Sequence, residues 1–183
     1  TNDIARPEDV KKFVSIIEQN ANNLMEMIND IMKISSLESM DGFNKVELQL
    51  DEIVNRVVMQ EKMTAQTRNV TITADLQAVT ITADESQMYQ LVNNLISNAV
   101  KYNRENGSVN VGLYTDGDNV VFSVSDTGIG ISQEHLDKIF ERFYVVDKSR
   151  NKNISSTGLG LSIVKHIVKA HNGTVTVNST PGK

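Results

Sequence analysis

The chain has 183 residues, and its 18 Lys and Arg against 23 Asp and Glu give a formal net charge of −5. Hydrophobic residues make up 39% and charged residues 22% of the chain, which is typical of a soluble globular protein and not of a disordered one. The acidic balance argues against a nucleic-acid-binding surface, and the lack of Cys excludes disulfides, thiolate nucleophiles and Cys-based metal sites.

The first predicted element is a long helix over residues 7–39. Pro7 suits the first turn of a helix, and apolar residues recur in a heptad pattern that is typical of a coiled coil or helical bundle. The heptad positions are filled by Val10, Phe13, Ile17, Leu24, Met27, Ile31 and Ile34. One helix cannot bury such a stripe alone, so we expect a partner helix. Gly42 is predicted to end the element.

From residue 43 onward, helical and strand patterns alternate, which predicts an α/β domain. The predicted helices span residues 50–67, 84–102, 133–139 and 159–170, and the predicted strands span residues 70–74, 79–82, 109–113, 120–124 and 174–177. The turn at residues 116–119 joins two of these strands into a hairpin. The helix over 84–102 has the widest apolar face.

That helix also carries a polar stripe. Asn94, Asn98, Lys101 and Tyr102 are spaced i, i+4, i+7 and i+8, so they share one side. Asn is a poor helix former, so the stripe lowers helix stability without adding burial. An amide oxygen suits Mg²⁺ and Lys suits phosphate, which favours a metal and phosphate site. A solvated helix face explains the stripe equally well from this helix alone.

A second motif is Asp126-Thr127-Gly128-Ile129-Gly130, directly after a predicted strand. Asp126 has the same parity as the apolar residues of that strand, so its carboxylate is predicted to point to the buried side. A buried carboxylate needs a hydrogen-bond donor, such as the exocyclic amine of adenine. Gly128 and Gly130 let the backbone approach a flat ligand. The alternative is a glycine turn capped by Asp.

A third motif is Thr157-Gly158-Leu159-Gly160-Leu161, at the start of a predicted helix. Free N–H groups at a helix N-terminus attract phosphate, although many helices start after Gly. Before it lie Phe140-Glu141-Arg142-Phe143 and a polar stretch over 147–157 that contains Lys148, Arg150 and Lys152. We interpret this stretch as a functional lid, and a solvated charge run is the alternative.

Taken in order, these motifs resemble those of the ATP-binding domain of bacterial sensor histidine kinases, within the Bergerat-fold group that includes gyrase-type ATPases. Residues 94–102 look like the N box, 126–130 the G1 box, 140–143 the F box and 158–161 the G2 box of that family. The resemblance implies a two-layer α/β sandwich, a mixed sheet with helices on one face, preceded by one long heptad helix. Residues 1–42 then resemble the second helix of the dimerisation and histidine-phosphotransfer hairpin. Residues 43–183 resemble the catalytic domain, short of its last strand.

The resemblance also implies roles for the matched residues in binding ATP and Mg²⁺. Asn98 would supply the Mg²⁺ ligand, and Asn94 and Lys101 would approach the phosphates as the catalytic positions. Tyr102 would pack on the nucleotide, and Asp126 would accept a hydrogen bond from the adenine amine. The other implied nucleotide-binding residues are Gly128, Gly130, Ile131, Phe143, Thr157, Gly158, Leu159, Gly160 and Leu161.

One residue bears on the type of reaction. Gyrase-like ATPases carry a Glu four residues before the Mg²⁺-binding Asn, where it can act as a general base. That position is Asn94 here, and an amide cannot take a proton, which favours phosphoryl transfer over hydrolysis. The family often has Arg two residues after the last F-box Phe, where this chain has Val145, and Lys148 or Arg150 could substitute for it.

The implied activity is that of a protein-histidine kinase, which passes the γ-phosphoryl group of ATP to a His for relay to the Asp of a response regulator. The family's acceptor His is followed by Asp or Glu, but His135, His166 and His171 are followed by Leu, Ile and Asn. We therefore expect the acceptor helix to precede Thr1, and this chain alone not to autophosphorylate.

Three further expectations concern the parent protein: homodimerisation through the hairpin bundle, a cytoplasmic location for this part, and membrane attachment only through regions outside this sequence. Two alternatives to a histidine kinase stay open. One is a Bergerat-fold ATPase or serine-directed kinase, and the other is a nucleotide-binding but inactive dimerisation module.

Overall fold

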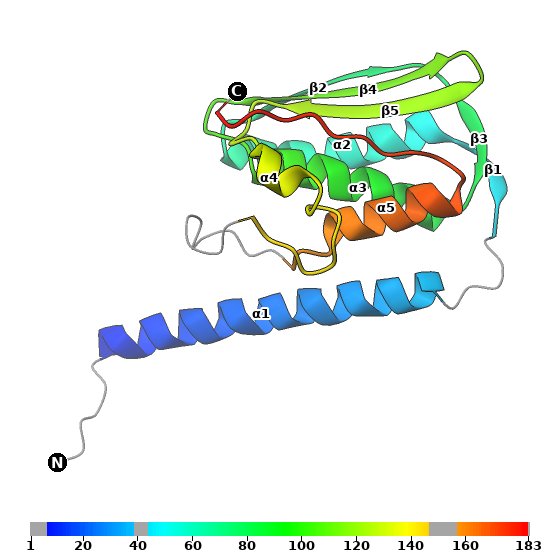
Figure 1. Ribbon diagram of the computed structural model, residues 1–183. Coiled ribbons are helices and arrows are strands. Elements are labelled where there is room, and N and C mark those ends of the chain that lie inside the picture. Colours follow the sequence, from blue (N-terminus) through cyan, green and yellow to red (C-terminus); the bar gives the residue numbers. More distant parts are fainter. Residues whose placement is uncertain (1–6, 39–43, 147–156, 183) are drawn as a thin grey trace.

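The computed structural model describes residues 7–38, 44–146 and 157–182. In chain order the elements are α1 (Pro7–Glu38), β1 (Val46–Gln49), α2 (Leu50–Thr67), β2 (Thr71–Leu76), β3 (Thr80–Ala83), α3 (Glu85–Lys101), β4 (Ser108–Asp116), β5 (Asn119–Asp126), α4 (Gln133–Leu136) and α5 (Gly160–Ala170). Figure 1 shows a sheet above a layer of helices, with α1 lying below that layer.

The main sheet is mixed and has the strand order β2-β4-β5. Its central strand, β4, pairs in parallel with β2 and antiparallel with β5, so that Val111 lies opposite both Ala74 and Val124. The predicted hairpin is therefore confirmed. β1 and β3 form a separate two-stranded antiparallel sheet. The sequence did not reveal β1, because its four residues are mostly exposed and carry no apolar run.

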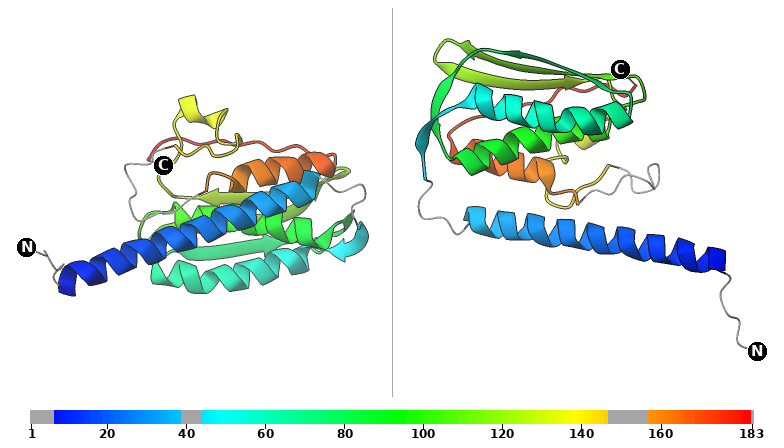
Figure 2. Two further views of the ribbon diagram at one scale, coloured as in Figure 1. Left: turned by 90° about the horizontal axis from the view of Figure 1, so that it is seen from below. Right: turned by 180° about the vertical axis from the view of Figure 1, so that it is seen from behind.

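Helices α2, α3 and α5 cover one face of the main sheet, as the views in Figures 1 and 2 agree. The inward residues of β4, Val109, Val111 and Leu113, are at most 2% exposed. The core is completed by Ile53, Val54, Val57 and Val58 of α2, by Leu91, Val92, Ile96 and Val100 of α3, and by Ile163, Val164 and Ile167 of α5. The expected two-layer α/β sandwich is confirmed.

Helix α1 confirms the predicted long helix and differs from the others in its burial. Phe13, Ile17 and Leu24 of its apolar stripe are 58%, 65% and 60% exposed. The helix runs along the underside of the domain and approaches it at α5 (Figure 2). Across the three described ranges, no helix is both long and apolar enough to cross a membrane.

Two predicted elements differ from the structure. α4 ends at Leu136 instead of Ile139, and after it the N–H groups of Lys138 and Glu141 bond to carbonyls three residues back, as in turns. Residues 174–177 are not a strand, although Val175 packs against the core and the exposure of the segment alternates. The prediction was wrong because alternation reflects extended backbone and does not require a hydrogen-bonded neighbour.

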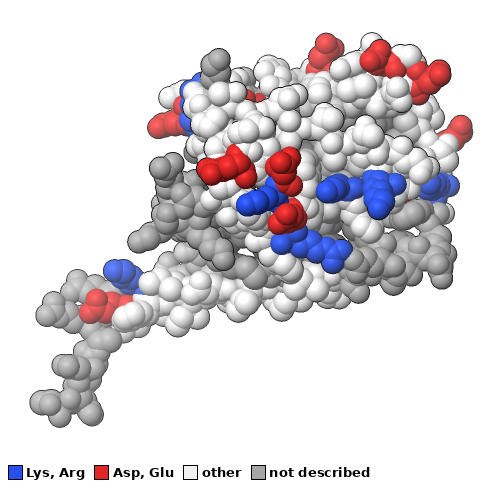
Figure 3. All heavy atoms as spheres, viewed as in Figure 1, with Lys and Arg blue, Asp and Glu red and all other residues white. Residues whose placement is uncertain are grey.

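Charged side chains are distributed unevenly over the two layers. On the face shown in Figure 3, Lys and Arg are spread along the helical layer with Asp and Glu among them, and acidic side chains gather toward the sheet at the upper right. Asp116 and Asp118, at the turn between β4 and β5, are both exposed. Most of the Lys and Arg side chains on this face therefore lie over the helices.

Candidate nucleotide-binding site

The polar stripe of α3 lies opposite its buried apolar face, as its spacing predicts. Asn94, Asn98, Lys101 and Tyr102 are all half-buried. The side-chain nitrogen of Asn94 is buried and has no hydrogen-bond partner in the part of the chain that the structure describes. An unpaired buried amide is costly, and a polar ligand placed beside Asn94 would satisfy it.

The start of α5 faces that stripe. A Cβ atom added at Gly160 would lie 3.5 Å from Oδ1 of Asn94 and 3.7 Å from Nδ2 of Asn98. The backbone of Gly160, the first residue of α5, therefore lies beside both amides, and the N–H groups of a helix's first turn favour an anion. Residues 66 positions apart in the sequence thus combine into one polar site.

The 126–130 turn joins the other end of the stripe. The N–H of Ile129 donates to the carbonyl of Tyr102 at 3.2 Å. A Cβ at Gly128 would lie only 2.5 Å from that same carbonyl oxygen, so only Gly fits there. The G1-like turn and the end of the N-box-like helix are therefore in direct backbone contact.

Asp126 departs from the expectation that its carboxylate is buried. It shares the strand parity of the half-buried Phe122 and Val124, but the residue itself is exposed. The reason is its place at the end of β5, where the chain leaves the sheet. Its Oδ1 accepts a hydrogen bond from the N–H of Gly128 at 2.8 Å. The Asp-capped glycine turn is thus present, and it engages one of the two carboxylate oxygens.

Gly130 and Ile131 face the C-terminal segment. A Cβ at Gly130 would lie 2.3 Å from the carbonyl oxygen of Thr180, and the φ of Gly130 is +69°. The N–H of Ile131 donates to Oγ of Ser179 at 2.9 Å. The structure therefore gives Gly130 a packing requirement of its own, in addition to the role implied by the resemblance.

The F-box-like and G2-like motifs meet at Gly158. Its φ is +69°, and a Cβ there would lie 2.6 Å from the carbonyl carbon of Phe143 and 2.9 Å from the nitrogen of Tyr144. Phe143 is itself at a positive φ of 63° and is 57% exposed. His135 holds this region by a 2.6 Å contact between Nδ1 and the Tyr144 hydroxyl. The residues on either side of 147–156 therefore lie together.

Several sequence predictions fall elsewhere. The basic residues Lys148, Arg150 and Lys152 of the predicted lid lie outside the described residues. Thr157 is half-buried, and its hydroxyl accepts a 3.3 Å hydrogen bond from the N–H of Leu159. Leu159 is 0% exposed and belongs to the core, so its contribution to a site is through packing.

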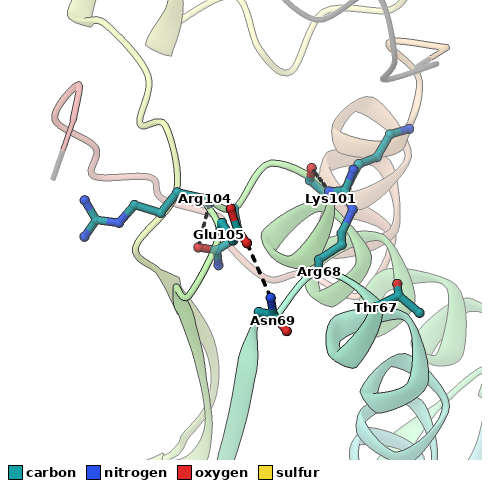
Figure 4. Close-up of a pocket in the computed structure, with 7 residues that line it drawn as sticks. Thr67, Arg68, Asn69, Lys101, Arg104 and Glu105 are labelled. Atoms are coloured by element: carbon teal, nitrogen blue, oxygen red, sulfur yellow. Dashed lines mark hydrogen bonds between the residues drawn. The ribbon is translucent and has the colours of Figure 1, made fainter.

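Sequence reasoning missed two residues that hold the site together. Arg68, at the end of α2, donates from its guanidinium to the carbonyls of Val100 and Lys101 (Figure 4). Asn103 bonds to Thr127 across the gap between α3 and the 126–130 turn. No local pattern could have revealed them, because the bonded residues are at least 24 positions apart in the sequence.

A pocket of about 290 Å³ lies beside this end of α3 (Figure 4). It is lined by Thr67, Arg68, Asn69, Lys101, Asn103, Arg104 and Glu105. In Figure 4 the side chains of Arg104 and Lys101 point away from each other, to opposite sides of the pocket. The pocket therefore does not focus its cations on one point, and it shares Lys101 with the polar stripe.

A divalent cation has limited protein ligands here. Among the described residues, no three His, Asp or Glu side chains gather as a metal cage. The Asn98 amide offers one oxygen of the hard type that Mg²⁺ prefers, and Mg²⁺ is commonly held by one or two protein groups together with substrate phosphates. The donor set fits a cation that arrives bound to a nucleotide.

Comparison with known proteins identifies related sequences. The model of the family described as histidine kinase-, DNA gyrase B-, and HSP90-like ATPase matches residues 83–183. The sensor-like histidine kinase SenX3 of Mycolicibacterium smegmatis is 32% identical over 178 residues, which cover 96% of this chain and 46% of SenX3. The sensor protein kinase WalK of Staphylococcus aureus is 33% identical over 177 residues, covering 94% of this chain and 42% of WalK. The chain thus spans less than half of the length of these relatives.

Solved structures show the same fold. Full-length ShkA, solved in complex with AMPPNP, has a TM-score of 0.78 and 27% identity, covering 100% of this chain and 38% of ShkA. The histidine kinase ThkA, solved in complex with the response regulator TrrA, has a TM-score of 0.73 and 24% identity, covering 94% of this chain and 48% of ThkA. The ShkA match includes α1, which lies outside the residues that the family model matches.

Proposed function

Because the chain belongs to the histidine kinase-, DNA gyrase B-, and HSP90-like ATPase family, we propose that it is the ATP-binding catalytic part of a sensor histidine kinase. It binds ATP with Mg²⁺ and transfers the γ-phosphoryl group to a His on a helix that is not in this sequence. The names of SenX3 and WalK support the kinase activity, and the AMPPNP bound to ShkA supports an adenine nucleotide as ligand.

The observation that carries the proposal is the unpaired amide of Asn94 beside Asn98 and the start of α5. A triphosphate placed there would accept hydrogen bonds from Nδ2 of Asn94 and from the free N–H groups of the first turn of α5. Lys101, at the end of the same stripe, supplies positive charge. The site therefore offers donors and positive charge to an anion from α3 and α5 together.

Mg²⁺ would be held by Oδ1 of Asn98, and when bound it neutralises part of the phosphate charge. Asn94 and Lys101 then orient the phosphates. Asn94 has no group that takes up a proton, so it cannot activate water as a general base. This favours transfer to a side chain of another helix over hydrolysis.

The adenine end of the site is assigned to the 126–130 turn and Tyr102. Asp126 has one carboxylate oxygen engaged with the N–H of Gly128, which leaves the other to accept from the adenine amine. The ammonium of Lys101 lies 5.9 Å from the centre of the Tyr102 ring, so the phosphate-binding and ring-stacking positions are adjacent. Asp126, beside the end of α3, and Asn94, facing the start of α5, thus mark the two ends of the proposed ligand.

We assign residues 1–42 to the second helix of a dimerisation hairpin and residues 43–183 to the catalytic domain. The exposed apolar stripe of α1 supports a homodimer formed through this helix and the proposed acceptor helix. A response-regulator receiver domain is the proposed recipient of the phosphoryl group, and ThkA forms such a complex.

The test supplies the missing acceptor. The chain is mixed with a separate helical hairpin that carries a His, together with Mg²⁺ and labelled ATP, and transfer of label to the hairpin is measured. We expect labelling of the hairpin and not of the chain itself. Asn98→Ala is expected to reduce the labelling at least tenfold, because it removes the proposed Mg²⁺ ligand. Asn55→Ala, at an exposed position of α2, is the matched control and should label normally.

Two results would contradict the proposal. An unlabelled hairpin in the presence of intact ATP binding would show that the chain is not a kinase domain for His. Phosphate release at the same rate with and without the hairpin would favour an ATPase instead.

A further inference from the structure

A hydrogen-bonded cluster joins the end of α3 to the 126–130 turn, and we call it the Asn103 junction. Its members are Asn103, Ala99, Ser108 and Thr127. The side-chain nitrogen of Asn103 donates to the carbonyls of Ala99 and Ser108, both at 3.0 Å. Its Oδ1 accepts from the N–H of Arg104 at 3.0 Å and from the Thr127 hydroxyl at 3.3 Å. Both hydrogens and both lone pairs of the amide are therefore used.

The Thr127 hydroxyl is fixed from two sides. It donates to Asn103 and accepts from the N–H of Ser108 at 2.8 Å. The N–H of Thr127 also donates to the carbonyl of Ser108 at 3.1 Å. Because Thr127 lies between Asp126 and Gly128, these bonds determine the direction of the backbone on both sides of it.

The junction is closely packed. A Cβ at Gly107 would lie 2.0 Å from Oδ1 of Asn103 and 2.8 Å from Oγ1 of Thr127, so the absence of a side chain there makes room for the cluster. On the other side, the 126–130 turn touches the carbonyl of Tyr102 through Gly128 and Ile129. A shift of Thr127 would therefore move Asp126 relative to the end of α3.

We propose that Asn103 and Thr127 are positioning residues that set the nucleobase selectivity of the site by holding Asp126 in place. The inference rests on the proposed function, in which Asp126 accepts a hydrogen bond from the amino group of adenine. Guanine carries a carbonyl oxygen at that position, which would face the carboxylate without a hydrogen. Such a mismatch is rejected strongly only when the carboxylate cannot move away from it.

The decisive variant is Thr127→Val, which keeps the branched shape of the side chain and removes the hydroxyl. Dissociation constants for ATP and GTP are measured with Mg²⁺ on the whole chain. We expect the wild-type chain to prefer ATP. The ratio of GTP to ATP dissociation constants should fall about tenfold in the variant, because Asp126 can then move away from the guanine carbonyl oxygen. Thr127→Ser restores a hydroxyl and should recover the ratio.

The matched control is a second Thr–Asn hydrogen bond on the outer face of the sheet. The hydroxyl of Thr73, on β2, donates to Oδ1 of Asn110, on β4, at 2.6 Å, and both residues are exposed. Thr73→Val removes this bond without touching the site, and should leave both dissociation constants unchanged. If Thr127→Val does not fold, Asn103→Ser removes the amide oxygen that accepts from the Thr127 hydroxyl. The ratio of GTP to ATP dissociation constants should fall in that variant as well.

The outcomes separate the inference from the proposed function. A wild-type chain that binds no ATP, or that prefers GTP, overturns the proposed function and this inference with it. A wild-type preference for ATP, together with an unchanged ratio in Thr127→Val, overturns this inference alone. An equal loss of affinity for both nucleotides does the same, because it shows a structural role without selectivity.

Discussion

Helices α1 and α3 are both amphipathic, but only α3 buries its apolar face. Val92 and Ile96 of α3 are 0% exposed, whereas Ile17 of α1 is 65% exposed. α3 is packed between α2, α5 and the strands, and α1 approaches the domain at α5. Apolar periodicity therefore determines that each helix forms and which side is apolar. Whether that side stabilises this chain depends on which neighbours the rest of the fold provides.

α3 is also held at both ends by residues from outside the helix. At its start, Asp84 accepts hydrogen bonds from the Gln87 N–H at 3.1 Å and from the Ser86 hydroxyl at 2.6 Å. At its end, the Arg68 guanidinium donates to the carbonyls of Val100 and Lys101. The stability of α3 thus has three separable sources, its face, its C-terminus and its N-terminus.

The largest effect is expected for the buried face. Ile96→Ala should lower the free energy of unfolding by about 2–5 kcal/mol, because it leaves a cavity in the core. Ile17→Ala is the matched change on the exposed face of α1, and should stay within about 0.5 kcal/mol. Urea unfolding followed by circular dichroism measures both.

An equal loss of unfolding free energy in Ile96→Ala and Ile17→Ala would show that the two apolar faces do not differ in their contribution to stability. A loss of stability in Ile17→Ala that grows with protein concentration would support the difference between the helices, because it would show that a second copy covers the apolar stripe of α1.

The C-terminus of α3 should give a smaller effect. Arg68→Met keeps much of the apolar stem but removes the donors to Val100 and Lys101, and should cost about 1.5–3 kcal/mol, the range for hydrogen bonds with a charged partner. Arg104→Met is the control on the rim of the same pocket, since the Arg104 side chain points away from the helix end in Figure 4. Its expected change is within about 0.5 kcal/mol.

The unfolding midpoints in urea distinguish the two Arg variants. Similar losses would show that general surface charge, and not the bonds to the helix end, accounts for the effect of Arg68.

Much of the fold follows from local patterns. The heptads of α1, the apolar face of α3 and the alternation of Val109, Val111 and Leu113 each predicted the observed element. The two errors in predicting strands have one cause in common. β1 exists through its pairing with β3, and residues 174–177 lack the pairing that their alternation led us to expect. Strand pairing depends on distant partners, which a single-sequence pattern does not contain.

The residues of the site also fall into those that the sequence predicted and those that only the structure showed. The stripe with Asn94 and Asn98 and the glycine motifs were visible in the sequence, because helical spacing and glycine content are local properties. The contact of Gly160 with that stripe, and the junction of Asn103 with Thr127, depend on the packing of α5 and β5. Hydrogen bonds that join distant segments have no local signature, so the groups that hold the site were found only in the structure.

The N-terminus of α3 should give the smallest and a pH-dependent effect. Burial by itself raises the pKa of Asp84, but hydrogen bonds from the Ser86 hydroxyl and from backbone N–H groups outweigh it and leave the pKa below its ordinary value. The ionised form is thus favoured in the folded state. Its contribution is fully present above the unfolded-state pKa of about 3.9, and is lost as the pH falls through the folded-state pKa.

Asp84→Asn tests this contribution, because Asn keeps the capping acceptor and removes the charge. At pH 7 the variant should be less stable by about 0.3–1 kcal/mol, the range for a charge at a helix N-terminus. The difference from wild type should disappear once the pH is below the folded-state pKa. Asp118→Asn, in the exposed β4–β5 turn, is the control and should differ from wild type by less than about 0.5 kcal/mol at each pH. If the stability difference between wild type and Asp84→Asn is as large in acid as at pH 7, the charge contributes nothing. The Asp and Asn caps would then differ only in shape.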